Sequence, residues 1–466
     1  MKSKKISTSL KGEYSRQKNA YLYKDALILC KRRGSTVVLE DDAVFIHADV
    51  TGIDKIYFEI KNNQVTISNI FKDFLDNDIN EEFMDFQKLR GYVPYPFTIL
   101  KGVMKAPPGL VTKIYPDENG ELQHNFMESD ALAIFNVDKH FNKRLFREGF
   151  KKLLLENATA YKELVSSFSG GFDSTFLTSI YSSKCTRILH FSEGKTEISR
   201  YKKIFPNSKW TIIDSNENFS DADKKKYFGS IDEPSCDSSG FAEYLMIKKI
   251  KNEEQDLDGD IIIMNGQGCD GLFTNGRTYF QEFIASRMPR YIKNMTKNRT
   301  NDSKISSKIR NYSLETKKRF MEIYLKDYTF SDRIHKGISD VYDMYAGAIK
   351  NDSANILAAC IVLMKYSIHG IEKIRTAAHA FGIRYYLPFM SENVIEYAFS
   401  IPSKYKVGYT HGKKILIKEY PEISKISFVT GAFLPQKLKE RFIGAEPSDS
   451  KYNGFYIQNW IDHNKL

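Results

Sequence analysis

The feature that most constrains the fold is a regular alternation of short apolar runs with amphipathic segments between residues 164 and 264. The apolar runs are LVSSF, RILHF, WTIID and DIIIM, and the segments between them have helical spacing: STFLTSIYSSK (174–184), EISRYKKIF (197–205) and FAEYLMIKKIKN (241–252). Strands that alternate with helices in this way form a largely parallel sheet covered by helices. We therefore expect an α/β domain whose first strand begins at Leu164.

The loop after the first expected strand carries the groups of a phosphate site. It reads SSFSGGFDST, residues 166–175. A loop that leaves a parallel strand and enters a helix presents backbone amides and a positive helix end to an anion. Gly170 and Gly171 lack the Cβ atoms that would keep an anion away, and hydroxyl donors stand at Ser169, Ser174 and Thr175. The alternative is a turn in which Ser169 or Asp173 merely caps the helix.

Asp173 adds a requirement for a cation. A carboxylate that points at phosphates repels them unless a metal ion lies between, so its presence implies Mg²⁺. Asp270 follows the strand DIIIM, which is expected to end at the same edge of the sheet. These two acids together predict a magnesium site, although Asp270 alone is also typical of a turn or a helix cap.

The rest of the chain divides into a β-rich front and a helical end. Runs with period-two alternation and turn residues between them fill the stretch from Ala26 to about Tyr115: ALILCKR, TVVLE, AVFIHA, KIYFEI, QVTISN and LVTKIYP. The proline-marked stretch 91–109 predicts an irregular connection. After Phe273 nearly all periodicity is helical. We expect the break near residues 118–135, and therefore domains at 1–130 and 131–466.

Composition is that of a globular protein in a reducing compartment. The 466 residues are 42% hydrophobic, and the formal charge of +11 comes from lysines scattered among acids, which predicts a solvated surface with at most one basic cleft. Five cysteines without CxxC spacing indicate neither a zinc site nor a disulfide framework, so we expect a cytoplasmic location. The start has no signal-peptide core, and ANILAACIVLM, from Ala354, is too short to cross a membrane.

Several motifs resemble one family. SGGFDS resembles the SGGxDS signature of the ATP pyrophosphatase, or PP-loop, families, which cleave ATP between the α- and β-phosphates. Four further stretches are similar to elements of asparagine-synthetase-like proteins: TILKGVMKAPPG (98–109), DEPSCDSSGFAEYLMIKKIK (232–251), IIMNGQGCDGLFTNG (262–276) and AAHAFGIRYYLPFMSENVIEYAFSIPSKYK (377–406). The resemblance spans about residues 35 to 440, with the motifs in the family's order.

The resemblance implies a particular architecture. The expected fold is a parallel five-stranded HUP-like sheet with helices on both faces and a helical C-terminal part, preceded by a small β-rich domain of the Ntn-hydrolase glutaminase type. Family members with glutaminase activity carry a catalytic cysteine at residue 2, whereas this chain has Lys2 and no thiol in its first 29 residues. We therefore expect a degenerate glutaminase remnant with a structural role.

The resemblance also implies a reaction and its site. A substrate carboxylate attacks the α-phosphate of ATP, pyrophosphate leaves, and an amine then attacks the acyl adenylate. The implied cofactors are ATP and Mg²⁺, with Asp173 and Asp270 as metal ligands. The residues implied to bind ATP are Ser167, Ser169, Gly170, Gly171, Asp173, Ser174, Ser192 and Gly266. The implied catalytic residues are Gln267, Glu372 and Lys425.

Two positions of the chain, Gln267 and Val429, depart from the family pattern. Gln267 stands where the family has a Glu or Tyr that assists deprotonation of the amine, and a neutral amide orients a substrate but does not accept a proton. Val429 stands where the family has a lysine over the acyl adenylate. Lys425, Lys413 and Lys414 are the candidates to supply that charge, and the alternatives are a different alignment of this loop, altered chemistry after adenylation, or loss of catalysis.

Three functions are compatible with these observations. The first is an amide-forming ligase without glutaminase activity, resembling the β-lactam synthetases and lasso-peptide cyclases or acting on a sugar acid. It would take a small-molecule or peptide carboxylate and an amine, with or without a partner protein that delivers a peptide; no membrane or nucleic acid is expected. The second is a tRNA-modifying PP-loop enzyme, suggested by the basic pI near 9.0 but lacking paired cysteines. The third is an inactive pseudo-synthetase that serves as a scaffold.

Overall fold

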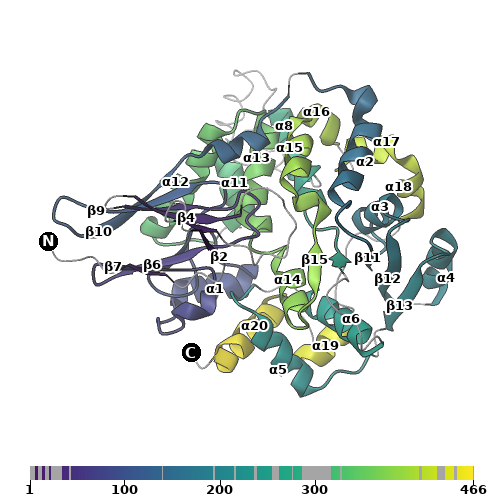
Figure 1. The fold of residues 1–466 in the computed structure, drawn as a ribbon, viewed down its shortest axis with the longest axis horizontal. Helices are drawn as coiled ribbons and strands as arrows, with labels where there is room; N and C mark the ends of the chain where they lie inside the picture. The colour runs from purple at the N-terminus through teal and green to yellow at the C-terminus, as the bar shows by residue number, and fades with distance from the viewer. Residues whose placement is uncertain are drawn as a thin grey trace, which may run out of the picture.

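A computed structural model gives the fold of most of the chain (Figure 1). The structure describes residues 6–8, 13–15, 20–22, 34–40, 43–138, 140–192, 195–214, 217–235, 239–253, 262–274, 277–285, 316–325, 328–408, 412–427, 436–444 and 449–464. The described part contains two β-sheets in the front third of the sequence, a five-stranded parallel sheet in the middle and helices toward the end.

The five-stranded sheet is parallel throughout, as expected. Its strand order is β13-β12-β11-β14-β15. The strands are β11 (Leu164–Phe168), β12 (Cys185–Ser192), β13 (Lys209–Asp214), β14 (Ile262–Met264) and β15 (Arg384–Tyr386). The first four coincide with the expected runs. The fifth lies in a stretch predicted to be helical, because three residues are too few to show a period of two.

Helices cover both faces of this sheet. Ile188 and Leu189 are neighbours on β12, yet Ile188 packs with Tyr201 of α4 and with Phe205 just after it, while Leu189 belongs to the large core on the other face. Helix α2 (Phe146–Asn157) precedes the first strand, and the helices that follow strands are α3 (Phe172–Ile180), α4 (Lys195–Ile204), α5 (Asp221–Ser230) and α6 (Gly240–Glu253). The prediction of helices on both faces is therefore confirmed.

The front part is β-rich, as expected. One sheet has the order β1-β7-β6-β8, from β1 (Ile6–Thr8), β6 (Tyr57–Lys61), β7 (Gln64–Ser68) and β8 (Val103–Lys105). The other has the order β10-β9-β5-β4-β3-β2, from β2 (Glu13–Ser15), β3 (Ala20–Leu22), β4 (Thr36–Glu40), β5 (Ala43–His47), β9 (Val111–Pro116) and β10 (Leu122–Met127).

Two expectations for this part need correction or stay open. The stretch 91–109 is not wholly irregular, because β8 pairs antiparallel with β6. The whole of the run expected at 26–32 lies outside the described residues. Helix α1 (Glu81–Arg90) and the short helices η1 (Phe71–Phe74), η2 (Asp130–Phe135) and η3 (Lys143–Leu145) complete the front and its connection. Strand β10 ends at Met127, close to the proposed break between domains.

The remainder is helical apart from β15, and it supplies a large share of the core. Its elements are α7 (Cys269–Leu272), α8 (Arg277–Ala285), α11 (Thr316–Leu325), α12 (Asp332–Ala348), α13 (Ser353–Ile361), the π-helical turn η4 (Val362–Tyr366), α14 (Glu372–His379), η5 (Pro388–Met390), α15 (Glu392–Ser400), α16 (Ser403–Lys406), α17 (Lys414–Glu419), α18 (Pro421–Ile426), α19 (Gln436–Ile443) and α20 (Asp449–Asn464).

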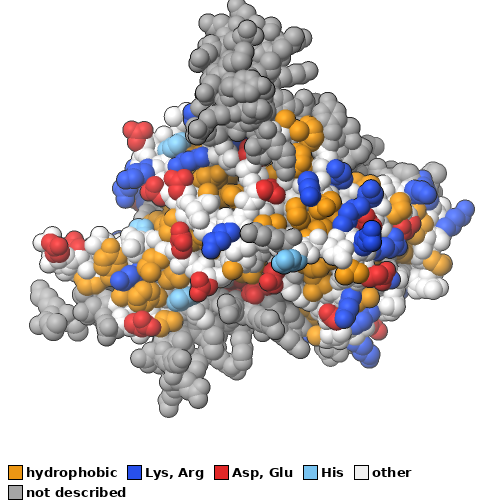
Figure 2. Space-filling model, turned by 90° about the horizontal axis from the view of Figure 1, so that it is seen from above, with side chains coloured by type: hydrophobic (Ala, Val, Ile, Leu, Met, Phe, Trp, Pro, Cys, Tyr) orange, Lys and Arg blue, Asp and Glu red, His pale blue; other side chains and the backbone are white. Residues whose placement is uncertain are grey.

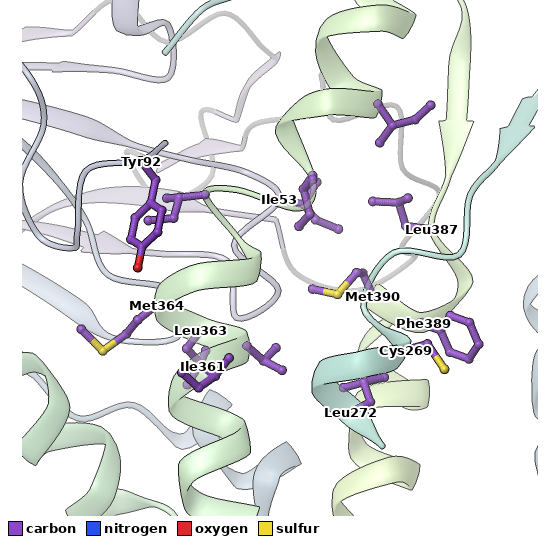
Figure 3. Packing of buried hydrophobic residues seen from close by; sticks show 14 of the residues in the cluster. Ile53, Tyr92, Cys269, Leu272, Ile361, Leu363, Met364, Leu387, Phe389 and Met390 are labelled. Carbon is purple, nitrogen blue, oxygen red and sulfur yellow. The ribbon is translucent and has the colours of Figure 1, made fainter. Parts of the chain in front are cut away.

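The apolar stretch from Ala354 forms the centre of that core. It folds as α13 and η4, and Figure 3 shows Ile361 and Leu363 between Tyr92 of the front part and the α7 residues Cys269 and Leu272. The same large cluster of buried side chains runs through both halves of the chain. Among the described residues, no helix combines the length and hydropathy that crossing a membrane requires.

Candidate functional site

The glycine loop between β11 and α3 has a backbone that only glycine accommodates. Gly170 has φ +77°, and a Cβ at this position would lie 2.3 Å from the hydroxyl oxygen of Tyr201. Gly171 is the N-cap residue of α3, and no side chain caps this helix. The Ser169 hydroxyl accepts a bond from the amide of Gly171 at 3.3 Å, which shapes the loop. The side chain of Asp173 points elsewhere, so the interpretation of the loop as a plain helix cap finds no support.

The serine hydroxyls of the loop are already hydrogen-bonded to the protein, whereas the buried hydroxyl of Thr175 has no partner among the described residues. Ser174 Oγ accepts from the amide of Ser169 at 3.2 Å and donates to the carbonyl of Gly171 at 3.2 Å. Ser167 lies below the loop at the end of β11, where its hydroxyl donates to the buried carboxylate of Glu243 at 2.9 Å. In this arrangement Ser167 supports the loop from beneath, while Ser169 and Ser174 set its curvature.

The two acids predicted to bind magnesium meet at one point. Lys413 Nζ lies 2.5 Å from Asp173 Oδ1 and 2.6 Å from Asp270 Oδ1. Asp173 lies in the first turn of α3, and Asp270 lies in α7 after β14, 97 residues later. They converge because β11 and β14 are adjacent parallel strands whose carboxyl ends reach the same edge.

Lys413 is held in this position by the backbone. Its amide donates to the carbonyl of Phe273 at 2.9 Å, just after the helix that carries Asp270. It has φ +59°, an uncommon conformation for a residue with a Cβ, and α17 begins at the next residue. Burial would lower the pKa of Lys413, but Asp173, Cys269 and Asp270 raise it above its usual value. The lysine is therefore a cation fixed between two carboxylates.

Asp173 is partly buried, with 22% of its side chain exposed. Burial raises the pKa of its carboxyl group, the charge of Lys413 opposes that rise, and the neighbouring Asp270 adds to it. The thiol of Cys269 donates a further hydrogen bond to Asp173. An acid in such surroundings gains strongly from a cation beside it.

The acid pair fits Mg²⁺ bound together with a nucleotide. The ammonium group of Lys413 already occupies the point between the two carboxylates, so the site accepts a cation. Within the described part of the chain, no group of three or more His, Cys, Asp or Glu residues has the arrangement of a metal site. Magnesium commonly uses one or two carboxylates and takes its other ligands from substrate phosphates and water, which these two acids match.

The loop after β14 packs directly on the glycine loop. A Cβ at Gly266 would lie 3.2 Å from Asp173 Cβ and 3.3 Å from the amide nitrogen of Ser174. Gly268 has φ +99°, and a Cβ there would lie 2.6 Å from the sulfur of Met390. Figure 3 shows Cys269 beside Phe389 and Met390. These glycines let the turn that carries Asp270 approach both the loop and η5.

Gln267 stands between Gly266 and Gly268. Its amide donates to Asn265 Oδ1 at 3.0 Å, and Asn265 Nδ2 donates to Glu243 Oε1 at 2.8 Å. The Gln267 side chain reaches toward η4 and α14, since a Cβ at Gly370 would lie 3.1 Å from Gln267 Oε1. Gln267 therefore lies on the path from Asp173 toward Glu372, and its catalytic role stays a prediction.

The other predicted residues lie in different surroundings. Glu372 begins α14 and is buried in ion pairs with Lys55 at 2.7 Å and Arg375 at 3.2 Å. Lys425 is exposed on α18, and its carbonyl lies 3.4 Å from Arg200 Nη2. Lys414 is also exposed and donates to the carbonyl of Lys404 at 3.3 Å. The side chain of Ser192 and the whole of Val429 lie outside the described residues.

Basic side chains gather on one face of the half of the molecule that holds the site. On the face shown in Figure 2, Lys and Arg side chains gather toward the end that carries α2, α3 and α4 in Figure 1, with acidic side chains among them. This agrees with the mixed lysine and acid pattern of the sequence. A cationic surround raises the local concentration of an anionic substrate such as a nucleotide.

A comparison with known proteins identifies the family. The family model for asparagine synthase matches residues 146–419, which is more than half of the chain. The chain belongs to the asparagine synthase family. No curated protein matches the chain. The matched span includes Asp173, Asp270, Glu372 and Lys413 and ends before Lys425.

Family membership bears out the coarse functional prediction. Members of this family are ATP-dependent ligases that form amides from a carboxylate and an amine. The match therefore favours this branch over the tRNA-modifying enzymes that share the SGGxDS signature. It leaves the substrates, the AMP-forming step and the glutaminase-deficient status as proposals.

Proposed function

We propose that the protein adenylates a substrate carboxylate with ATP, releases pyrophosphate, and couples the acyl adenylate to an amine without a glutaminase activity of its own. The observation that carries this proposal is the meeting of Asp173 Oδ1 and Asp270 Oδ1 at one cation beside the glycine loop. An acid pair beside such a loop has a clear chemical use when a metal ion bridges it to phosphates.

Each part of the site has a role in this reaction. The amides of Gly170 and Gly171 and the N-terminus of α3 would bind the phosphates. Asp173 and Asp270 would hold Mg²⁺, which supplies neutralising charge to the pyrophosphate when it is bound. Lys413 would supply the additional positive charge that Val429 does not provide. Positioning and charge neutralisation account for most of the rate in such reactions.

The amine would come from the substrate or from solution. Three cysteines fall in the described residues, Cys185, Cys269 and Cys360, and all three are buried in the part of the chain after residue 130. Burial raises the pKa of each of these thiols, so none of them is suited to nucleophilic release of ammonia from glutamine.

The products of ATP cleavage test this proposal. The full-length protein is incubated with Mg-ATP, labelled pyrophosphate and a panel of carboxylic acids, and label appearing in ATP is measured. We expect exchange with one class of acid, and AMP with pyrophosphate as products once an amine is added. Formation of ADP would contradict the adenylation step. Nucleotide binding without exchange for any acid would instead support the scaffold alternative.

The lysine that acts in adenylation can be identified by comparing three variants. Lys413→Met should reduce the exchange rate by roughly 100-fold, because it removes a charge that lies beside the metal site. Lys414→Met is the matched control, since it changes the neighbouring but exposed lysine, and Lys425→Met tests the alternative residue. Both controls should keep the wild-type rate; a large loss in Lys425→Met alone would show that Lys425 supplies the charge.

A further inference from the structure

A buried cluster of charges joins the front part of the chain, the described residues up to 130, to the described residues from 131 onward, which we call the ligase part. The cluster contains three cations and three carboxylates: Lys55, Lys105, Arg375, Asp232, Glu233 and Glu372. Lys55 and Lys105 come from the front part, and the other four come from the ligase part. Side chains in this cluster are 1% to 16% exposed. The charges are therefore stabilised mainly by their partners in the cluster and little by water.

The DEP motif forms the docking point for the front part. Asp232 accepts hydrogen bonds from the amides of Phe71 and Lys72 at 3.0 and 3.1 Å. Glu233 accepts from Lys55 at 3.2 Å and from Lys105 at 2.7 Å, and the Tyr57 hydroxyl donates to it at 3.0 Å. The front part is therefore joined by directional hydrogen bonds to Asp232 and Glu233.

Glu372 connects this cluster to the ligase site. Lys55 Nζ and Arg375 Nη1 both approach Oε1 of Glu372, at 2.7 and 3.2 Å. Within the described part of the chain, no residue is seen to donate a hydrogen bond to Oε2, although the side chain is only 4% exposed. A buried carboxylate with one oxygen fixed by two cations and the other unpartnered is arranged to accept a donor from a ligand.

The turn that precedes Glu372 lies beside the loop that carries Gln267. Gly370, two residues before Glu372, contacts the Gln267 side chain, and Gly266 contacts Asp173. These contacts connect Asp173, one of the two acids proposed to hold Mg²⁺, through Gln267 to the turn that precedes Glu372. Lys55 and Arg375 hold the pKa of Glu372 below its usual value although burial acts in the opposite direction, so the group stays ionised. An ionised carboxylate binds and orients an amine or ammonium N–H but is a weak acceptor of its proton.

We propose that Lys55, a residue of the front part, is a positioning residue that fixes Glu372 through Oε1 so that Oε2 binds the incoming amine. The inference rests on the proposed function. It gives the front part a task beyond structure: it completes the amine site of the ligase part. Lys105 is the matched reference, because it is equally buried in the same cluster but pairs with Glu233 and not with Glu372.

The test uses hydroxylamine as the amine, with Mg-ATP and the carboxylic acid identified by pyrophosphate exchange, and measures hydroxamate formed by the full-length protein. In the wild type the rate should saturate with hydroxylamine. Lys55→Met should keep pyrophosphate exchange but raise the KM for hydroxylamine about tenfold or more, because the bond to a charged acceptor is misplaced. Lys55→Arg should restore saturation, and Lys105→Met should keep the wild-type KM.

The outcomes separate this inference from the proposed function. An unchanged KM in Lys55→Met, or a wild-type rate that rises linearly with hydroxylamine, overturns the role of Lys55 while pyrophosphate exchange still supports adenylation. Absence of exchange with every acid overturns the proposed function and this inference with it. Where Lys55→Met does not fold, Lys55→Gln keeps amide donors without the charge, and the same shift in KM is expected.

Discussion

Asp173→Asn and Asp270→Asn should each abolish most of the pyrophosphate exchange, with a loss on the order of 100-fold to 1000-fold. The reason is geometric. Both carboxylates contact the ammonium group of Lys413, so under the proposed function each would supply charge to the same Mg²⁺. Because they act as a unit, the double variant should be little worse than either single variant.

Three measurements make this prediction specific. Chelation of divalent ions should stop exchange in the wild type, and Mg²⁺ should restore it. Asp270→Asn should need a higher Mg²⁺ concentration for half-maximal exchange, since one of its two protein ligands is neutral. Asp340→Asn removes an exposed acid of α12 and should keep the wild-type rate. Exchange that survives in Asp173→Asn would show that the acids hold only Lys413 and no metal.

The alternating strands and helices of the ligase part could be predicted from sequence because each strand there has an apolar run. LVSSF is buried at all five positions, which is why it reads as a continuous run of a central parallel strand. β15 was not predicted because its three residues, Arg384–Tyr386, are too few to show an alternation of apolar and polar side chains. Their strand geometry comes from pairing with β14. β8 was not predicted for the same reason, since Val103–Lys105 is short and pairs with β6 inside a proline-rich stretch.

The acid pair could be predicted because parallel strands bring their carboxyl ends to one edge, whatever their separation in sequence. The position of Lys413 could not be assigned that way. It depends on a backbone hydrogen bond to Phe273 and on a positive φ, and neither has a signal in a stretch that reads HGKK. The hydroxyl of Ser167 was expected at the nucleotide, but it donates to Glu243, an acid that reads as part of an ordinary amphipathic helix.

The buried charge cluster between the front part and the ligase part could not be predicted from the sequence, for a different reason. Glu372 reads as one acid in a helix, and Lys55 as one of many lysines. Their pairing needs the complete packing of the front part on α14. A lysine that is 1% exposed is rare, but sequence periodicity places it no differently from an exposed one.

The same cluster leads to a large expected effect on stability, at Glu233. This carboxylate accepts from Lys55, Lys105 and Tyr57, all of them buried. Glu233→Gln removes the carboxylate that pairs with the buried Lys105 and one of the two carboxylates that pair with Lys55, so the free energy of unfolding should fall by about 3–5 kcal/mol. The measurement is urea-induced unfolding followed at several wavelengths, since the two parts need not unfold together. Glu253→Gln is the matched control, because its partner Arg187 lies 2.9 Å away but Glu253 is 36% exposed, and about 1 kcal/mol or less is expected.

The dependence of this effect on pH provides a second check. Burial alone would raise the pKa of Glu233, but Lys105 and Lys55 hold it below its usual value of 4.5. A carboxyl whose pKa is lower in the folded state stabilises the protein fully above its unfolded-state pKa, and that stabilisation is lost as the pH falls through the folded-state value. The difference in unfolding free energy between the wild type and Glu233→Gln should therefore be constant near neutral pH and shrink below about pH 4.5. A difference that persists unchanged in acid would mean that the hydrogen bonds of Glu233, and not its charge, join the front part to the ligase part.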